Sequence, residues 1–429
     1  MRLVGLLSSY VRTRRLRFGD RAALEAHQAR QWQLHAARTL RHSPYFSAWV
    51  GQPLHAWPTM DKAWMMRHFD AMNTAGLRLE QVLHCAHESE RTRDFRPRMG
   101  AFSVGLSSGT LGGRGVFVVS PEEQAQWAGV ILARLLPRGL LRRERVALFL
   151  RANNNLYRTV RTPWLNFSFF DLFEPLEAYV DALQRLQPTR VVAPAQVLRA
   201  IALLQRDGRI RLRPQGVVSV AEVLEPRDRQ LLVDVFGRVD EVYQATEGFL
   251  GSTCEQGALH LNEEFLHVEP QWLDADRFVP LITDFTRRTQ PIVRYRLDDV
   301  LVRRGTPCGC GRPTMVLDRI EGRCDDMLRL PARTGGSIPV FADVIHRALA
   351  QVLPMTADYR LTQTGPASLE LWTDAAQAGS RAQAQQHLSR VLGGLGVDLA
   401  VLAWPAPAGA PATDFMTKRR RVRRLCQEA

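Results

Sequence analysis

The feature that most constrains the fold is a repeated alternation of short apolar runs with helix-like segments. Runs typical of buried strands occur near residues 117–119, 146–150, 191–194 and 217–220. The segments between and after them, such as the one that begins at Pro121, have the apolar spacing and first-turn residues of helices. Because parallel strands need a crossover connection, usually a helix, this order predicts an α/β fold with a mainly parallel sheet.

The pattern of predicted strands and helices changes along the chain and divides it into two parts. After Leu281 short strands and turns replace the alternation, and after Asp325 the chain has a second set of elements of its own. In this last part we expect helices over 341–353 and 374–392 and a strand over 367–372. The sequence therefore predicts two domains, residues 1–325 and residues 326–429.

Composition excludes several classes of protein. The 429 residues carry a formal charge of +14 and are 45% hydrophobic, which is typical of a globular chain and not of a disordered one. No apolar run approaches the roughly 20 residues of a membrane span, and the opening segment lacks the cleavage site of a secretory signal. Six cysteines are too few for a disulfide scaffold in a chain of this length. We therefore expect a cytoplasmic protein without a membrane span.

Arginine supplies almost all of the positive charge. Of the 57 basic residues only Lys62 and Lys418 are lysines, and Lys418 opens a dense basic run over 418–424. Clustered arginine neutralises phosphate, so nucleic acid is one alternative partner. No nucleic-acid-binding motif accompanies the run, so we consider nucleic acid unlikely and interpret the run as a solvated tail.

A glycine-rich segment over 106–115, LSSGTLGGRG, is the strongest local signal. Glycines let backbone N–H groups converge on anionic oxygens, and serine and threonine hydroxyls add donors. The segment is not a Walker loop, because it lacks Gly-Lys-Ser/Thr and leads into a strand. It is either a phosphate-binding loop or a Gly/Ser hairpin turn.

Further motifs follow this loop in order. They are YQATEG at 243–248, RYRLDD at 294–299, IEGRCDDML at 320–328 and the lysine at 418. With the loop, the set resembles the adenylate-forming superfamily of acyl-CoA ligases and adenylation domains, and most closely its phenylacetate–CoA ligase branch. HSPYFSAW at 42–49 and WPTMDKAWM at 57–65 also resemble the opening segment of that branch.

The resemblance implies an α/β fold with a large N-terminal adenylate-forming domain, in which helices flank mixed sheets, and a small mobile α+β C-terminal domain. It implies that ATP, with Mg²⁺, activates a small-molecule carboxylic acid as an acyl-adenylate and that pyrophosphate is released. The acyl group then passes to a thiol, either coenzyme A or the phosphopantetheine of an acyl carrier protein. A second interpretation is a catalytically degenerate member that binds nucleotide or a partner, because the loop is altered and Thr417 replaces the usual Gly before Lys418.

The resemblance also assigns residues to the reaction. Lys418 would contact the acyl carboxylate and the α-phosphate, which a compact ammonium on a flexible stem can do. Glu247 would hold the Mg²⁺, and Thr246 would contact the α-phosphate. Tyr243 would stack near the adenine, and Asp299 would accept both ribose hydroxyls. The β- and γ-phosphates would be cradled by Ser107, Ser108, Gly109, Thr110 and Gly112.

Three more residues match motifs of the family. Arg323 would approach the nucleotide, and Asp325 would be the hinge about which the C-terminal domain rotates between the half-reactions. Lys62 matches an early lysine of the branch, and we interpret it as a fold or surface residue. The phosphate loop departs from the family at Leu111 and Arg114, where a second Thr and Gly-x-Pro are common.

Two pairs of soft ligands predict a structural zinc site. Cys254 and His260 lie in one glycine-containing turn, and Cys308 and Cys310 lie in another. Neither spacing is a standard C-x₂-C, so buried cysteines without a metal are the alternative. The phenylacetate–CoA ligase branch often has a similar arrangement here, and the resemblance therefore favours zinc.

An aromatic run over 164–175, WLNFSFFDLFEP, is the candidate acyl pocket. The resemblance places the acid between a helix around 164–180 and the loop before the tyrosine at 243. The lining that we expect is Trp164, Phe167, Phe170 and Ala245, which would suit an aryl or unsaturated acid. The alternative is that the phenylalanines belong to the hydrophobic core.

Overall fold

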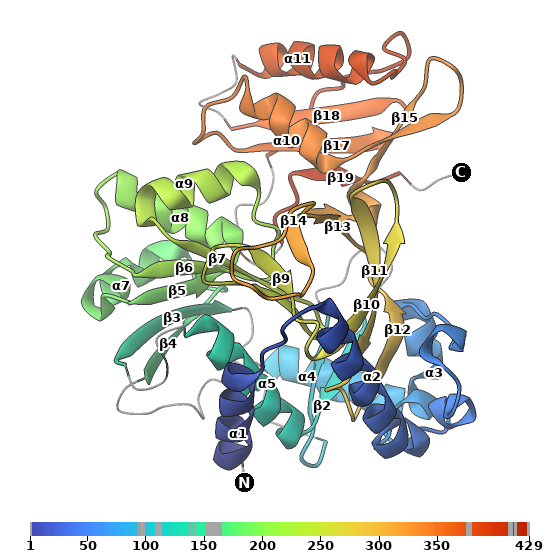
Figure 1. Cartoon of the computed structure of the whole chain (residues 1–429). Coiled ribbons are helices and arrows are strands. Elements are labelled where there is room, and N and C mark those ends of the chain that lie inside the picture. The colour runs from blue at the N-terminus through green and yellow to red at the C-terminus, as the bar shows by residue number, and fades with distance from the viewer. Residues whose placement is uncertain are drawn as a thin grey trace.

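A computed structural model shows how these segments are arranged (Figure 1). The structure describes residues 2–92, 94, 99–107, 114–136, 139, 142–150, 165–374, 380–410, 415 and 418–426. A large mixed sheet runs through the body of the molecule, and a smaller unit formed by residues 328–424 lies above it in the view of Figure 1.

The first half of the main sheet is parallel, with the strand order β4-β3-β5-β6-β7. The strands are β3 (Glu144–Leu150), β4 (Leu165–Asp171), β5 (Arg190–Ala193), β6 (Gly216–Ser219) and β7 (Val239–Gln244). Helices α8 (Ala195–Arg206) and α9 (Pro226–Phe236) make the crossovers after β5 and β6. Every residue of β5 and β6 is buried, as expected of parallel strands that are covered on both faces. The predicted α/β alternation is confirmed.

The second half of the main sheet is antiparallel. Beyond β7 it continues in the order β8-β9-β14-β13-β11-β10, and β12 pairs with β11. The strands are β8 (Phe249–Thr253), β9 (Leu259–Leu261), β10 (Leu266–Trp272), β11 (Arg277–Asp284), β12 (Ile292–Arg296), β13 (Asp299–Arg303) and β14 (Val316–Arg323). The sheet is therefore mixed, with twelve strands among the described residues. The expectation of a mainly parallel sheet holds for the first half alone, because the strands after β7 pair with antiparallel neighbours.

The remaining helices of the first 325 residues flank this sheet and a small hairpin. They are α1 (Arg2–Arg15), α2 (Arg21–Arg38), α3 (Lys62–Met72), α4 (Leu79–Thr92), α5 (Pro121–Leu135), α7 (Val180–Leu186) and the short 3₁₀ turns η1 (Leu40–His42), η2 (Phe46–Trp49), η3 (Leu54–Ala56), η4 (Leu176–Tyr179) and η5 (Cys324–Asp326). The α5 helix begins with a capping box between Ser120 and Glu123. Strands β1 (Ser103–Leu106) and β2 (Val116–Val119) pair on either side of the glycine-rich segment. No helix in the described part of the chain is long and apolar enough to cross a bilayer.

The C-terminal unit has its own sheets and its own hydrophobic core. Its elements are β15 (Leu328–Pro331), β16 (Ser337–Val340), α10 (Ala342–Ala350), β17 (Tyr359–Gly365), β18 (Ser368–Thr373), α11 (Ser380–Gly394) and β19 (Val422–Arg424). The last strand, β19, pairs in parallel with β17. Buried residues from Leu328 to Val422 form one apolar cluster, which holds these elements together.

Candidate active site

A cavity of about 960 Å³ lies where the C-terminal unit meets the main sheet. One wall follows the carboxyl ends of two parallel strands: residues 221–223 come after β6, and residues 245–247 come after β7. In parallel α/β sheets this is the edge at which ligands bind. Another wall comes from the C-terminal unit and includes Lys418 and residues 407–410. The cavity has the size of a site for a cofactor or another small molecule.

Tyr243, Asp299 and Arg323 meet at this cavity. The Tyr243 hydroxyl donates a hydrogen bond of 2.8 Å to the Asp299 carboxylate, which joins β7 to the start of β13. Asp299 stands opposite Arg323 in the ladder between β13 and β14. Burial raises the pKa of Asp299, although the Tyr243 hydrogen bond and the charge of Arg323 oppose the shift. A carboxylate oriented by a neighbouring hydroxyl is therefore presented to the cavity.

Thr246 and Glu247 occupy the tight turn between β7 and β8. Ala245 and Gly248 close this turn with two backbone hydrogen bonds of 3.0 and 3.3 Å. A glycine is needed at 248, because a Cβ there would lie 2.6 Å from the Asp284 carboxylate. The close approach of this neighbouring strand fixes the turn, and both Thr246 and Glu247 line the cavity.

Both lysines of the chain line the same cavity. Lys62 is the first residue of α3, and its Cγ lies 3.5 Å from where a Cβ of Gly115 would be. Burial raises the pKa of Glu247, and the charge of Lys62 opposes this shift. Lys418 approaches from the C-terminal unit, and its charge opposes the effect of burial on the pKa of Asp299. Lys62, which the sequence analysis interpreted as a fold or surface residue, therefore lies at the cavity.

The base of the glycine-rich segment also lies at the cavity. Ser107 lines it, and two hydrogen bonds of 2.8 Å join Ser107 to Gly115 across the hairpin. Arg114, one of the departures from the family motif, pairs with Glu90 of α4. The other predicted residues of the cradle, Ser108, Gly109, Thr110 and Gly112, lie outside the described residues.

Several residues that the sequence analysis did not single out line the cavity as well. They include Gln196, Glu222, Arg360 and Trp372. Ala221, directly after β6, has a left-handed φ of 66°, which is unusual for a residue other than glycine and is typical of functional sites. The available signal was the sequence AEV at 221–223, directly after the predicted strand at 217–220, because this position is the carboxyl end of a parallel strand.

The predicted hinge lies at the junction of the two parts of the molecule. Asp325 is in η5, which connects β14 of the main sheet to β15 of the C-terminal unit. The neighbouring Asp326 accepts hydrogen bonds from Arg420, close to the end of the chain. The junction is therefore held by an ion pair within the C-terminal part.

The aromatic run forms the edge strand β4 and not the expected helix. Phe170 stacks on Phe149 with ring centroids 4.8 Å apart, in the core cluster that includes residues of α8. Phe167 packs against a different core cluster, which includes residues of α5. Phe167 and Phe170 are an odd number of positions apart in the strand, so their side chains lie on opposite faces of the sheet. Among the described residues of the predicted pocket, Ala245 lines the cavity, and the two phenylalanines do not. Trp164 lies outside the described residues.

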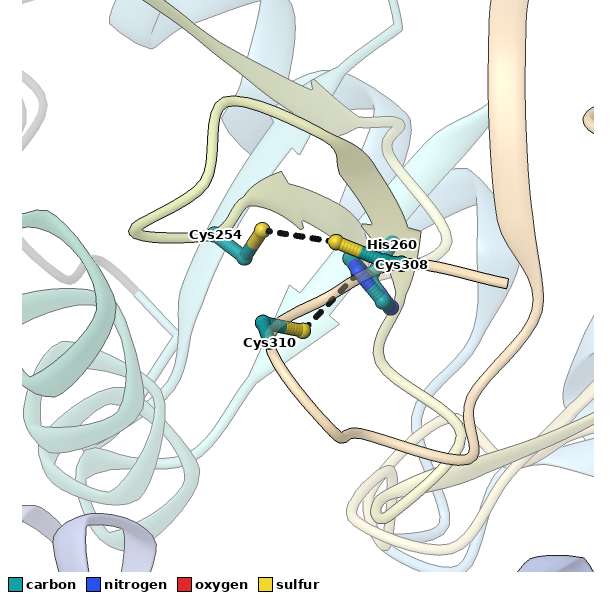
Figure 2. A group of neighbouring side chains, drawn as sticks. All are labelled: Cys254, His260, Cys308 and Cys310. Carbon is teal, nitrogen blue, oxygen red and sulfur yellow. Dashed lines mark hydrogen bonds between the residues drawn. The ribbon is translucent and has the colours of Figure 1, made fainter. Parts of the chain in front are cut away.

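The four predicted metal ligands form one cluster, as Figure 2 shows. Cys254, His260, Cys308 and Cys310 have ligand atoms that all lie within 4.8 Å of one another. The two sulfur atoms of Cys254 and Cys308 are 3.6 Å apart, and Cys310 Sγ is 3.4 Å from His260 Nε2. In a tetrahedral site with ordinary zinc bond lengths such atoms are about 3.6–3.8 Å apart. The donor set and its spacing fit a four-coordinate zinc ion.

A further hydrogen bond orients the histidine of this cluster. His260 Nδ1 lies 2.8 Å from the Thr314 hydroxyl, so Nε2 faces the cysteines. Burial lowers the pKa of His260 to about 4, and the imidazole is therefore neutral, the form that binds metals. Cys254 lies in the turn between β8 and β9, whereas His260 lies in β9 itself and not in the same turn as expected. The ligands thus join this hairpin to the loop between β13 and β14.

The basic run at 418–424 is not a solvated tail. The side chains of Arg419 and Arg421 are 7% and 2% exposed, and both pair with Asp228 at the start of α9. Arg421 also pairs with Glu225. The expectation of a solvated tail is wrong because the acidic partners are distant in sequence, so no local pattern reveals them.

Comparison with known proteins finds similarity in structure alone. A scan against protein-family models and a search of curated proteins both give no match. The chain is similar to 2-hydroxyisobutyryl-CoA ligase in the postadenylation state, with a TM-score of 0.68 and 16% identity over 95% of this chain and 90% of that one. It is also similar to the anthranilate CoA ligase AuaEII in complex with anthranoyl-AMP, with a TM-score of 0.51 and 14% identity over 74% of this chain and 65% of that one.

The similarity to the first ligase varies with the state of that enzyme. The TM-score is 0.68 for the postadenylation state, 0.58 for an open conformation and 0.50 for the thioesterification state. Of these three, the postadenylation arrangement is therefore the one that this molecule resembles most. With its large mixed sheet, flanking helices and separate small sheets, the chain has the fold of the adenylate-forming acyl-CoA ligases.

Proposed function

We propose that this protein is an AMP-forming acid–thiol ligase, which activates a carboxylic acid with ATP and passes the acyl group to a thiol. The observation that supports it most is the convergence of Lys418, Glu247 and Asp299, from distant parts of the chain, on one cavity in this fold. The similar ligases are described in complex with acyl-adenylates, and one of them also with coenzyme A. Both ligands belong to the chemistry proposed here.

The residues of the cavity fit ATP and Mg²⁺. The hard carboxylate of Glu247 is a suitable Mg²⁺ ligand, and Lys62 and Ser107 offer a cation and a donor at the base of the glycine-rich segment. Asp299, oriented by Tyr243, can accept both ribose hydroxyls. When bound, Mg²⁺ neutralises charge on the phosphate oxygens.

In the first half-reaction a carboxylate oxygen of the acid attacks the α-phosphorus. An oxygen–phosphorus bond forms, and the bond to the β-phosphate oxygen breaks, so that pyrophosphate leaves. Because an anion attacks an anionic phosphate, neutralisation of charge matters more than proton transfer. Lys418 supplies positive charge between the acid and the α-phosphate, Lys62 does so at the departing phosphates, and Thr246 donates a hydrogen bond to the α-phosphate.

In the second half-reaction the thiolate sulfur of the acceptor attacks the acyl carbon, and AMP leaves with the bonding electrons. We assign residues 1–325 to the adenylate-forming domain and residues 326–429 to a C-terminal domain that rotates about Asp325 between the two steps. The separate hydrophobic core of the C-terminal unit and its short connection through η5 support this division.

The order of the motifs supports a place beside the phenylacetate–CoA ligase branch, with an aryl or unsaturated acid as substrate. The acceptor is coenzyme A or the phosphopantetheine of an acyl carrier protein. We place the reaction in the cytoplasm, where cysteines remain reduced, and the absence of a disulfide among the six cysteines, all of them within the described residues, is compatible with this location.

We assign a structural zinc ion to Cys254, His260, Cys308 and Cys310. The geometry of the four ligand atoms and the neutral imidazole support it. Such an ion would tie the β8–β9 turn to the β13–β14 loop. It would thereby hold the strand after Glu247 against the strand that begins with Asp299.

Acid-dependent release of pyrophosphate tests the proposed reaction. With ATP and Mg²⁺, the protein is expected to release pyrophosphate with at least one acid from a panel of aryl and unsaturated carboxylic acids. Glu247→Gln is expected to lower this rate by about 100-fold, on the order of the loss of one transition-state contact. The exposed Glu80→Gln on α4 serves as the matched control and should behave as the wild type. ATP binding without any turnover would instead identify a degenerate, nucleotide-binding member of the fold.

A further inference from the structure

A buried charge cluster joins the C-terminal unit to α9 next to Lys418. We call it the latch and define it as Arg419 and Arg421 from the C-terminal unit with Glu225 and Asp228 from the start of α9. Arg421 donates to both carboxylate oxygens of Asp228 at 3.1 Å and also pairs with Glu225. Arg419 pairs with the same Asp228. All four side chains are less than one tenth exposed.

Two further carboxylates connect the latch to the cavity and to the C-terminal core. Glu222, which lines the cavity, accepts the backbone N–H of Arg419 at 3.3 Å. Asp358, directly before β17, accepts from Arg421 Nε at 2.9 Å, so this one guanidinium contacts carboxylates of both units. The residue that follows Lys418 is thus held through its main chain and its side chain.

The latch is a set of permanent charges at neutral pH. Burial alone would raise the pKa of Asp228, but the surrounding guanidinium groups lower it to about 2. The carboxylates around Arg421 raise its pKa despite burial. Removing one partner of such a cluster leaves a buried charge without compensation, which is strongly unfavourable. The cluster therefore favours one docked arrangement, with the 418–421 segment against α9.

We propose that Arg419 and Arg421 are positioning residues for Lys418, which hold its segment in the cavity during adenylation and release it when the latch opens for the thiol acceptor. This inference rests on the function proposed above, and it gives a role to basic residues that the adenylation chemistry itself does not use. A residue that acts through Lys418 should affect the first half-reaction and not the second. It should also have no further effect once Lys418 has been removed.

The first test measures the two half-reactions separately on the full chain. Arg421→Gln is expected to slow acid-dependent pyrophosphate release by about 100-fold, the scale of a misplaced reacting group. The transfer of the acyl group from a chemically prepared acyl-adenylate to coenzyme A should be unchanged or faster. In a Lys418→Ala background the same substitution should cause no additional loss. Arg347→Gln is the control, because Arg347 lies on α10 with its side chain 70% exposed and pairs with Asp343 of the same helix.

Equal slowing of both half-reactions, or a full additional loss in the Lys418→Ala background, would overturn the positioning role. A second measurement does not depend on activity. Asp228→Asn keeps the shape of the side chain but removes its charge, and it is expected to speed hydrogen exchange at the Arg419 amide by about tenfold. Arg347→Gln should leave this exchange unchanged.

Unchanged exchange in Asp228→Asn would show that the latch does not hold the segment, and the inference would then be wrong. If exchange responds as expected but the wild-type protein releases no pyrophosphate with any acid, the proposed function fails while the docking of this segment by the latch stands. The two failures are therefore distinguishable.

Discussion

Tyr243 and Asp299 show at the scale of single residues how the proposed nucleotide site is built. They lie 56 positions apart in the sequence, yet a hydrogen bond of 2.8 Å joins them at the cavity. The hydroxyl holds one carboxylate oxygen and so orients the other acceptor positions of Asp299. This orientation is what a pair of ribose hydroxyls requires.

We therefore expect Tyr243→Phe to weaken ATP binding more than it slows turnover. The loss of one hydrogen bond to a carboxylate is worth about 1–2 kcal/mol, so the KM for ATP should rise by about 5–30-fold with a smaller change in kcat. Tyr179→Phe is the control, because Tyr179 bonds to Asp171 at the distant β4 edge. A variant with unchanged KM and a greatly reduced kcat would contradict the ribose role of this pair.

Glu321 is a titratable residue at the contact between the main sheet and α10. Burial and a shared hydrogen bond with Asp343 raise the pKa of Glu321 from its ordinary value of 4.5 to about 7, although Arg277 opposes the shift. Arg319 also faces the two carboxylates. Between pH 4.5 and 7 the folded protein holds a proton that the unfolded chain has lost.

The contribution of this proton to stability is present below pH 4.5 and is lost as the pH rises through about 7. We expect Glu321→Gln, which cannot titrate, to flatten the dependence of Tm on pH in this window, by at most about 1.4 kcal/mol per pH unit in stability. Thermal unfolding at several pH values measures the effect, with Glu80→Gln as the control. Parallel curves for Glu321→Gln and the wild type would refute it.

At the scale of elements, the Cys/His cluster lies beside the short ladder in which β9 pairs with β14, and it connects the two loops next to that ladder. The β8–β9 turn carries Cys254, and the β13–β14 loop carries Cys308 and Cys310. A structural zinc ion contributes directly to the folding free energy, because the unfolded chain has no preformed site. The stability of this part of the molecule should therefore depend on the metal.

We expect the purified protein to contain one zinc ion per chain. Cys308→Ser should lose it and lower Tm by several degrees, at about 1 °C for each kcal/mol in a chain of 429 residues. Cys426→Ser, outside the cluster, should keep both the metal and the Tm. Metal analysis together with thermal unfolding checks this prediction. It would be contradicted if the wild type purified without zinc and unfolded at the same temperature as the Cys308→Ser variant.

Local patterns predict an element when the segments next to it in the sequence are also the segments it packs against in the fold. The run β5–α8–β6–α9 is predictable because each apolar strand is followed at once by the helix that covers it. The two ligand pairs are predictable because the members of each pair are close in sequence, although His260 lies in strand β9 and not in the turn that carries Cys254. Strand β4 is not, because a run as aromatic as that over 165–171 suits a buried helix or a strand equally, and its pairing with β3 decides.

At the scale of the whole molecule, the position of the C-terminal unit could not be predicted from the sequence. Arg421 and its partner Asp228 are 193 residues apart. Because the carboxylates that pair with the arginine-rich run are so distant in sequence, the run is interpreted as a solvated tail from the sequence alone. The cavity residue Lys62 is missed for the same reason, since only the fold brings α3 beside Glu247. The sequence does show that lysine is scarce, and the structure shows that both lysines line the same cavity.

The central claim is that this cavity makes an acyl-adenylate with the help of Lys418. The most direct measurement is mass spectrometry of the acid-dependent adenylate that forms with ATP and Mg²⁺, for the wild type and for Lys418→Arg, which keeps the net charge. We predict an adenylate from the wild type and about 100-fold less from the variant, because a planar guanidinium cannot replace a compact ammonium in this geometry. No adenylate from the wild type with any acid, or equal amounts from both proteins, would contradict the account.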